Sequence, residues 1–194
     1  KFLSSSLAIV LALSVVFTTF SGLFTFAGSS SANEIEVWDG TVATSFADGD
    51  GTSANPYKIT NGAELLLAVS STGRDSNGNK YYYSLENDIY LNDVTNLTWK
   101  NWTANEWPSI DIDATTGASA FGGVFNGNEH RVYGIYLKKA VNKPATEVPD
   151  TSRAAGLFPV VAAGAEISGV GVESSYIAIT NDHSDAKKAY AGYV

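Results

Sequence analysis

"FGGVFNGNEHRVYGIYL" occupies residues 121–137, and "GLFPVVAAGAEISGVGV" at residues 156–172 reads much the same. Both stretches alternate glycine with aromatic and aliphatic residues and show no helical period, which indicates short strands joined at glycine corners. Matching Gly123–Phe125 to Gly156–Phe158 gives an offset of 33 residues. Self-similarity at this spacing is typical of a solenoid.

The residue types favour a parallel β-helix, in which each coil consists of several short strands and successive coils stack. The strands alternate β-branched and small residues, and glycine or asparagine stands at the corners. Matching Val132–Leu137 to Ile167–Val172, at an offset of 35 residues, predicts inward-facing ladders of side chains. These are Val132 over Ile167, Ile135 over Val170 and Leu137 over Val172. An antiparallel β-sandwich is the alternative, because it also uses short strands and turns.

The residues before the repeat predict a closed first end for the stack. Asn61 can cap a helix over Ala63–Ser70, whose leucine and valine residues share one face. A strand is expected at Tyr57–Ile59, and two more within Tyr81–Asp93 on either side of an Asn-Asp corner. Because a solenoid core needs a covered end, we expect this helix to act as a cap.

The beginning of the chain predicts export. Lys1 is the only charged residue before Glu34, residues 7–27 are apolar, and residues 28–32 are small. This order is typical of a secretory signal peptide, cleaved after Ala27 or Ala32, with a retained membrane anchor as the alternative. The mature form is expected to have no membrane span.

The predicted domains are a signal peptide at residues 1–32 and a β-helix domain at residues 33–194. The cap is expected at about residues 33–120 and the first repeated coils at about residues 121–194. Since the chain lacks a first Met and stops within a strand pattern, we expect a C-terminally truncated part of a longer protein.

Four stretches carry a resemblance to a known family: "DGDGTSANPYKITNGAELLLA", "YYYSLENDIYLN", "FGGVFNGNEHRVYGIYL" and "AAGLFPVVAAGAEISGVGVESSYI". In this order, over about residues 49–194, the chain resembles the start of bacterial surface proteins that carry GLUG motifs. The resemblance implies an exported, right-handed parallel β-helix of adhesin-like character, and it implies no catalytic set. Glu129 and Pro159 both stand where the motif usually has glycine.

Charge and composition exclude several functional classes. The net charge is −8, and all 20 acidic residues lie after the apolar start, so binding to a phosphate backbone is not expected. The chain has no Cys, which excludes disulfides, thiolate catalysis and a cysteine-based zinc site.

Candidate binding residues lie between the cap and the repeat. Trp99, Trp102 and Trp107 could stack on sugar rings, although one or two of them could equally be buried at the cap. Asp111 and Asp113 would point to the same side of a strand, where paired carboxylates can bind calcium or hydrolyse glycosides.

No catalytic residue and no cofactor is predicted for this segment. His130 falls in a turn, where a structural hydrogen bond is favoured over catalysis. "DGDGT" at residues 48–52 resembles part of a calcium loop, but it lacks the closing Glu, so a plain turn is favoured.

The sequence therefore predicts an exported, non-catalytic protein of the cell surface or extracellular medium that binds a glycan or a host protein. One alternative is the N-terminal part of a β-helix polysaccharide lyase or hydrolase. The other is a structural stalk.

Overall fold

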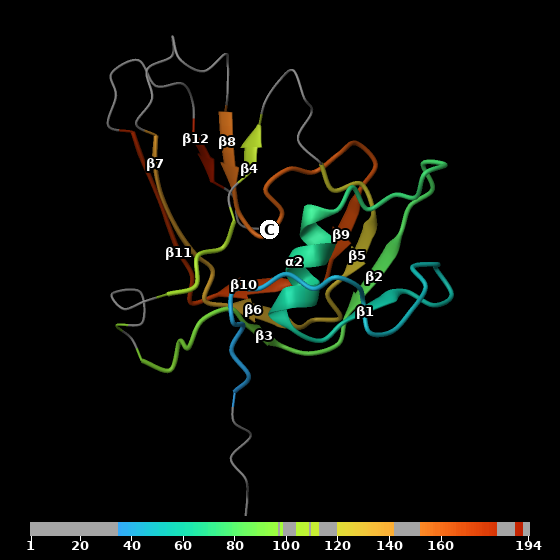
Figure 1. Ribbon diagram of the computed structural model, residues 1–194, viewed down its shortest axis with the longest axis horizontal. Helices are drawn as coiled ribbons and strands as arrows, with labels where there is room; N and C mark the ends of the chain where they lie inside the picture. Colours follow the sequence, from blue (N-terminus) through green and yellow to red (C-terminus); the bar gives the residue numbers. More distant parts are fainter. Residues whose placement is uncertain are drawn as a thin grey trace, which may run out of the picture. The chain divides into compact units, whose positions relative to one another are not determined.

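The chain returns to the same sheets in the same order, as the computed structural model shows (Figure 1). The structure describes residues 35–96, 98, 104–108, 110–112, 120–141, 152–181 and 189–191. Among these residues it has mostly short strands, one short helix and predominantly parallel pairing, so the all-β prediction is confirmed. No helix in this part of the chain is long and apolar enough to cross a membrane.

The first elements lie where the sequence predicts them. They are β1 (Tyr57–Ile59), α2 (Gly62–Ser70), β2 (Tyr82–Leu85) and β3 (Ile89–Tyr90). The side chain of Asn61 accepts a 2.9 Å hydrogen bond from the backbone N–H of Glu64, which satisfies one of the open donors in the first helical turn. The buried face of α2 contributes Leu65, Leu66 and Val69 to the core, as their spacing predicts.

Two successive sets of strands then pair with one another. The first set comprises β5 (Val124–Asn126), β6 (Arg131–Tyr133), β7 (Tyr136–Val141) and β8 (Ser152–Ala155). The second comprises β9 (Glu166–Ser168), β10 (Gly171–Glu173), β11 (Tyr176–Asn181) and β12 (Ala189–Ala191). Each strand of the second set pairs in parallel with the corresponding strand of the first.

Parallel pairing also extends to strands before residue 121. Strand β2 lies between β1 and β5, and β3 pairs with β6, so the stacking crosses the predicted boundary between cap and coils. One pairing is antiparallel: β4 (Ile110–Ile112) runs against β8. The sandwich alternative is contradicted, because its sheets would be antiparallel throughout.

The observed register differs from the predicted ladders. Val132 pairs with Val172 and not with Ile167, while Leu137 pairs with Ile177 and not with Val172. The prediction that Val170 stacks over Ile135 is also wrong, because Ile135, which directly precedes β7, lies beside Ser175 and Tyr176, whereas Val170 precedes Gly171, the partner of Arg131.

The error is a shift by one strand. The phrase at Val132–Leu137 runs from β6 through a glycine corner into β7, whereas the phrase at Ile167–Val172 runs from β9 through a glycine corner into β10. Matching the two phrases therefore aligns β9 with β6, although β9 pairs with β5 and β10 pairs with β6. In the last strand of each set, Ala191 pairs with Ala155.

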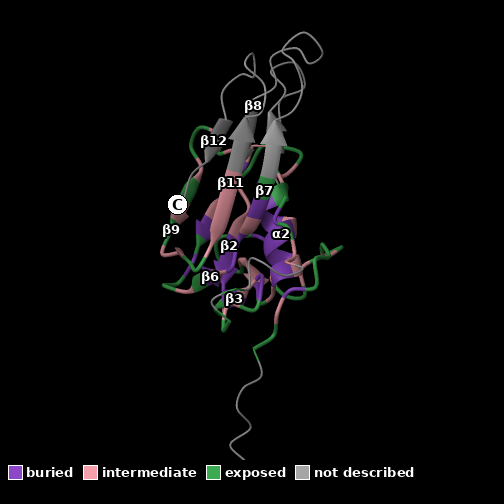
Figure 2. Ribbon diagram, turned by 90° about the vertical axis from the view of Figure 1, so that its left-hand side faces the viewer, coloured by how far each residue is buried: buried purple, intermediate pink, exposed green. Residues whose placement is uncertain are grey.

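Burial decreases along the stack of inward-facing residues (Figure 2). Phe125, Val132 and Leu137 in the first set of strands are 0% exposed. The residues paired with them, Ile167, Val172 and Ile177, are only partly buried. The second set of strands is therefore covered on one side only within the described residues.

A buried asparagine links three segments that are distant in the sequence. Asn92 is 5% exposed, and its amide nitrogen donates to the backbone oxygens of Asn105 and Gly134 at 3.0 and 2.8 Å. Its side-chain oxygen accepts from the backbone N–H of Asn105 at 2.8 Å. Both ends of the amide group are thus satisfied, which makes its burial favourable.

Candidate functional site

The sheet formed by β3, β6 and β10 has a polar and aromatic outer surface. Ile89 and Val132 are buried, whereas Tyr90 and Tyr133, each one residue later, are half-buried on the opposite side. The two tyrosine rings stack with centroids 4.6 Å apart and planes 8° from parallel. Glu173 pairs with Tyr133 on the third strand. We call this surface, made by Asp88, Tyr90, Arg131, Tyr133 and Glu173, the tyrosine face.

Charged groups surround the stacked rings. The side chain of Arg131 donates through Nε to Glu173, and both side chains are about half exposed. The carboxylate of Asp88 accepts from the backbone N–H of Arg131 at 2.9 Å and lies 3.1 Å from His130 Nδ1. The face therefore offers carboxylate acceptors, a guanidinium donor and phenol groups side by side.

The positions of these groups shift two pKa values. Burial raises the pKa of the Tyr133 hydroxyl, and the carboxylates of Glu173 and Asp88 raise it further. The hydrogen bond to Glu173 raises the pKa of Arg131. At neutral pH the phenol is therefore a hydrogen-bond donor and the guanidinium a cation.

A shallow depression of about 400 Å³ lies at one side of the tyrosine face. It is lined by Glu129, Arg131, Gly169, Val170, Gly171, Val172 and Glu173. Its volume lies within the range of roughly 300–1,000 Å³ that is typical of small-molecule sites. The mixture of two carboxylates, one guanidinium and a glycine-rich backbone suits a ligand with many hydroxyl groups.

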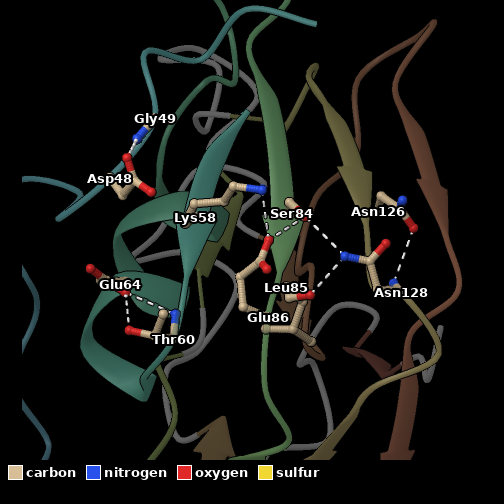
Figure 3. A network of polar contacts seen from close by, with 10 residues as sticks. All are labelled: Asp48, Gly49, Lys58, Thr60, Glu64, Ser84, Leu85, Glu86, Asn126 and Asn128. Atoms are coloured by element: carbon tan, nitrogen blue, oxygen red, sulfur yellow. Dashed lines mark hydrogen bonds and ion pairs between the residues drawn. The ribbon is translucent and has the colours of Figure 1, made fainter. Parts of the chain in front are cut away.

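A network of polar contacts holds the turn that leads into this surface (Figure 3). The amide nitrogen of Asn128 donates to Ser84 Oγ and to the backbone oxygen of Leu85, each at 2.9 Å. Ser84 Oγ donates to Glu86 Oε1 at 2.7 Å, and Lys58 Nζ lies 3.0 Å from the same oxygen. These hydrogen bonds, that from Ser84 first, lower the pKa of Glu86. The network ties the turn after β5 to the ends of β1 and β2.

The same turn contains two non-glycine residues in the left-handed region. Asn128 has φ 49° and Glu129 has φ 64°. Asparagine tolerates this conformation better than most residues, and here its side chain is held by hydrogen bonds. Glu129 lines the depression and stands where the resembling motif has glycine. The turn thus places a carboxylate at the depression in a backbone conformation that favours glycine.

The structure separates the predicted binding residues. Trp107 is 1% exposed and packs edge-on against Trp38, with ring centroids 5.4 Å apart, so it is a core residue and offers no ligand surface. Trp99, Trp102 and Asp113 lie outside the described residues. Asp111 belongs to β4, where its backbone pairs with Arg153 of β8.

Other sequence-based interpretations can be located. His130 lies at a corner, where its backbone N–H donates to the oxygen of Gly127 and its ring contacts Asp88, in keeping with the predicted structural role. Asp48 and Asp50 each accept from backbone N–H groups of their own turn. No group of three or more His, Cys, Asp or Glu residues within the described part of the chain is placed to hold a metal ion.

Sequence reasoning overlooked the tyrosine face, although a signal for it was present. In both "DIYL" and "RVYG", a tyrosine directly follows the aliphatic residue that faces the core. Strand alternation places such a tyrosine on the outer surface. Only the correct register adds Glu173 to the same row.

No protein-family model, curated protein or solved structure matches this chain. The GLUG-motif resemblance therefore stays a prediction. The signal peptide also stays a prediction, because residues 1–32 lie outside the described residues.

Proposed function

We propose that this chain is an exported, right-handed parallel β-helix that binds a neutral glycan through the tyrosine face and does not cleave it. The observation that best supports glycan binding is the stacked pair of Tyr90 and Tyr133 beside the ion pair of Arg131 and Glu173. Export is supported by the charge-poor apolar start of the sequence. The β-helix is supported by the order of the strands, because β5 to β8 and then β9 to β12 enter the same four sheets in the same order. In this architecture α2 acts as the cap of the stack.

The chemistry of the face favours a polyol. Carboxylates and guanidinium groups bind sugar hydroxyls by charge-assisted hydrogen bonds, and aromatic side chains pack against their C–H surfaces. The chain has a net charge of −8, which disfavours anionic polysaccharides. The partner is therefore expected to be an uncharged extracellular glycan.

The proposal is tested on an array of neutral and acidic glycans, with the chain and its Tyr133→Ala variant. Loss of the stacked phenol should weaken binding to neutral glycans about tenfold, corresponding to roughly 1–2 kcal/mol for one aromatic contact with its hydrogen bond. Tyr82→Ala is the matched control, because Tyr82 is half-buried on β2, in a different sheet. Circular dichroism verifies that both variants fold.

A reducing-sugar assay and an unsaturated-product assay on the bound glycans complete the test. Product release that disappears in the Asp111→Asn, Asp113→Asn variant would establish the lyase or hydrolase alternative. Absence of binding to every glycan would favour the stalk.

A further inference from the structure

We infer that Asn77 is a site of spontaneous chemical modification, where the side-chain amide is lost as ammonia and aspartate and isoaspartate form in its place. The inference goes beyond glycan binding, because it concerns the loop between α2 and β2 and not the tyrosine face. It rests on a comparison of the Asn-Gly pairs of the chain, of which the fold leaves one open to the reaction and holds the others.

The reaction needs no enzyme, because the following residue supplies the nucleophile. The backbone nitrogen of Gly78 attacks Cγ of Asn77 and gives up its proton. A C–N bond forms, and the Cγ–Nδ2 bond breaks as Nδ2 leaves with that proton as ammonia. Water then opens the resulting succinimide ring at either carbonyl carbon, which gives aspartate or isoaspartate. Glycine after the asparagine favours the attack, since it has no Cβ to hinder the nitrogen.

The chain has three Asn-Gly pairs, at residues 61–62, 77–78 and 126–127. Because all three have the same reacting atoms, we expect their rates to differ through the fold. Attack requires an asparagine side chain that is free to turn toward the next backbone nitrogen. It also requires a glycine N–H that can leave its hydrogen bond at little cost.

The pair at residues 77–78 meets both requirements. Asn77 and Gly78 are exposed, and the side chain of Asn77 makes no hydrogen bond within the described part of the chain. The N–H of Gly78 donates to the backbone oxygen of Asp75 at 3.0 Å, across an exposed turn. No atom lies within 4 Å of the place where a Cβ of Gly78 would stand. Opening this turn therefore disturbs no core contact.

The pair at residues 126–127 is held by the sheet. The side-chain oxygen of Asn126 accepts from the N–H of Asn128 at 3.0 Å, which turns it away from the next nitrogen. Gly127 is buried, and its N–H donates to the backbone oxygen of Ser168 at 2.7 Å. Attack here would have to break the contact between β5 and β9.

The pair at residues 61–62 is held by the helix. The side-chain oxygen of Asn61 accepts from the N–H of Glu64 at 2.9 Å, and its amide nitrogen donates to Thr60 Oγ1 at 3.3 Å. Gly62 is buried against the ring of Trp38. Attack here would remove the N-cap of α2, so the fold selects Asn77 among the three asparagines.

The consequences of the modification should stay within the loop. Isoaspartate adds one carbon to the main chain at Asn77, and this displaces the oxygen of Gly78, which accepts from Arg74 at 2.9 Å. The base of the loop is held separately, because the N–H of Tyr81 donates to the oxygen of Gly73 at 2.8 Å. Modified molecules are therefore expected to stay folded and to carry one additional negative charge.

The test is an incubation of the full chain in mildly alkaline buffer, followed by peptide mapping with mass spectrometry. The conversion of an amide to a carboxyl group is measured at each Asn-Gly pair, and isoaspartate is detected by enzymatic methylation. Asn77 should react at least about tenfold faster than Asn61 and Asn126 in the folded chain, because only its turn opens without cost to the core. In concentrated urea the three rates should agree within about threefold, because unfolding removes the contacts that distinguish them.

Two variants in the same loop serve as controls. Gly78→Ala should slow the reaction at Asn77 at least about fivefold, because the added Cβ hinders the attacking nitrogen. Ser76→Ala changes an exposed neighbour but keeps the Asn-Gly pair, so its rate should match that of the parent chain. Circular dichroism before and after incubation verifies that the modified protein is folded.

Three results would overturn the inference. Equal rates at the three pairs in the folded chain, or a faster reaction at Asn126 or Asn61, would show that the fold does not select Asn77. An amide at Asn77 that persists in the folded chain but is lost in urea would show that the turn protects it. The same order of rates in urea would assign the selection to neighbouring residues in the sequence. None of these results depends on whether the tyrosine face binds a glycan.

Discussion

Replacing Glu129 with glycine should stabilise the protein. Glu129 has φ 64°, in the region where an ordinary side chain costs about 1–2 kcal/mol relative to glycine. Glycine also gives the unfolded chain more freedom, which offsets about 0.5–1 kcal/mol of this gain. The free energy of unfolding should therefore rise by about 0.5–1 kcal/mol, equivalent to an increase in Tm of roughly 1–4 °C for a chain of this size.

The neighbouring residue supplies a control with the opposite sign. Asn128 has φ 49°, but its amide nitrogen donates two 2.9 Å hydrogen bonds, to Ser84 and Leu85. Asn128→Gly removes both bonds, and the relief of strain is small because asparagine tolerates this region. We expect a loss of about 1–2 kcal/mol.

Urea denaturation of both variants, followed by tryptophan fluorescence and circular dichroism, measures the two changes. A less stable Glu129→Gly variant would refute the reasoning, because it would mean that the turn is not left-handed at this residue or that the carboxylate contributes to stability. An Asn128→Gly variant as stable as the parent would show that the corner network contributes nothing.

Three further experiments test the core, its gradient of burial and the acid response. Asn92→Ala should cost about 3 kcal/mol in urea denaturation, since buried backbone groups would lose their partners; a cost below 1 kcal/mol would contradict the described contacts. Val132→Ala should cost about 2–3 kcal/mol and Val172→Ala only about 1 kcal/mol, because only the first residue is fully buried; equal costs would argue against an open edge. The Ser84 hydroxyl, first among its partners, holds the pKa of Glu86 below its ordinary value of 4.5 in the folded state, so its stabilisation is present above that value and is lost as the pH falls through the lower folded-state pKa. Glu86→Gln should therefore flatten the decrease of Tm as the pH falls below about 5, and an unchanged pH profile would refute this role.

Local features of the fold could be predicted from the sequence because they depend on neighbouring residues. The helix N-cap at Asn61 and the apolar face of α2 each depend on residues that are close together in the sequence, and the structure confirms both. The strand at Tyr57–Ile59 is also confirmed, since aromatic and β-branched residues stand between turn signals.

The register could not be predicted in the same way, because it depends on pairing between distant residues and similar phrases recur at successive corners of the chain. The phrase at Ile167–Val172 resembles that at Val132–Leu137 because both run from a strand through a glycine corner into the next strand, but the first spans β9 and β10 and the second β6 and β7, so Val172 pairs with Val132. An error of this kind also hides the candidate site, since Glu173 joins Tyr133 only in the correct register. The burial of Trp107 likewise depends on a contact with Trp38, far away in the sequence.

Backbone NOE measurements on the isotope-labelled protein test the stacking of successive strands most directly. The account predicts contacts between the backbone protons of Val132 and those of Val172 and its neighbours, together with contacts between Leu137 and Ile177. Contacts from Val132 to Ile167 in their place would contradict the register, and with it the tyrosine face.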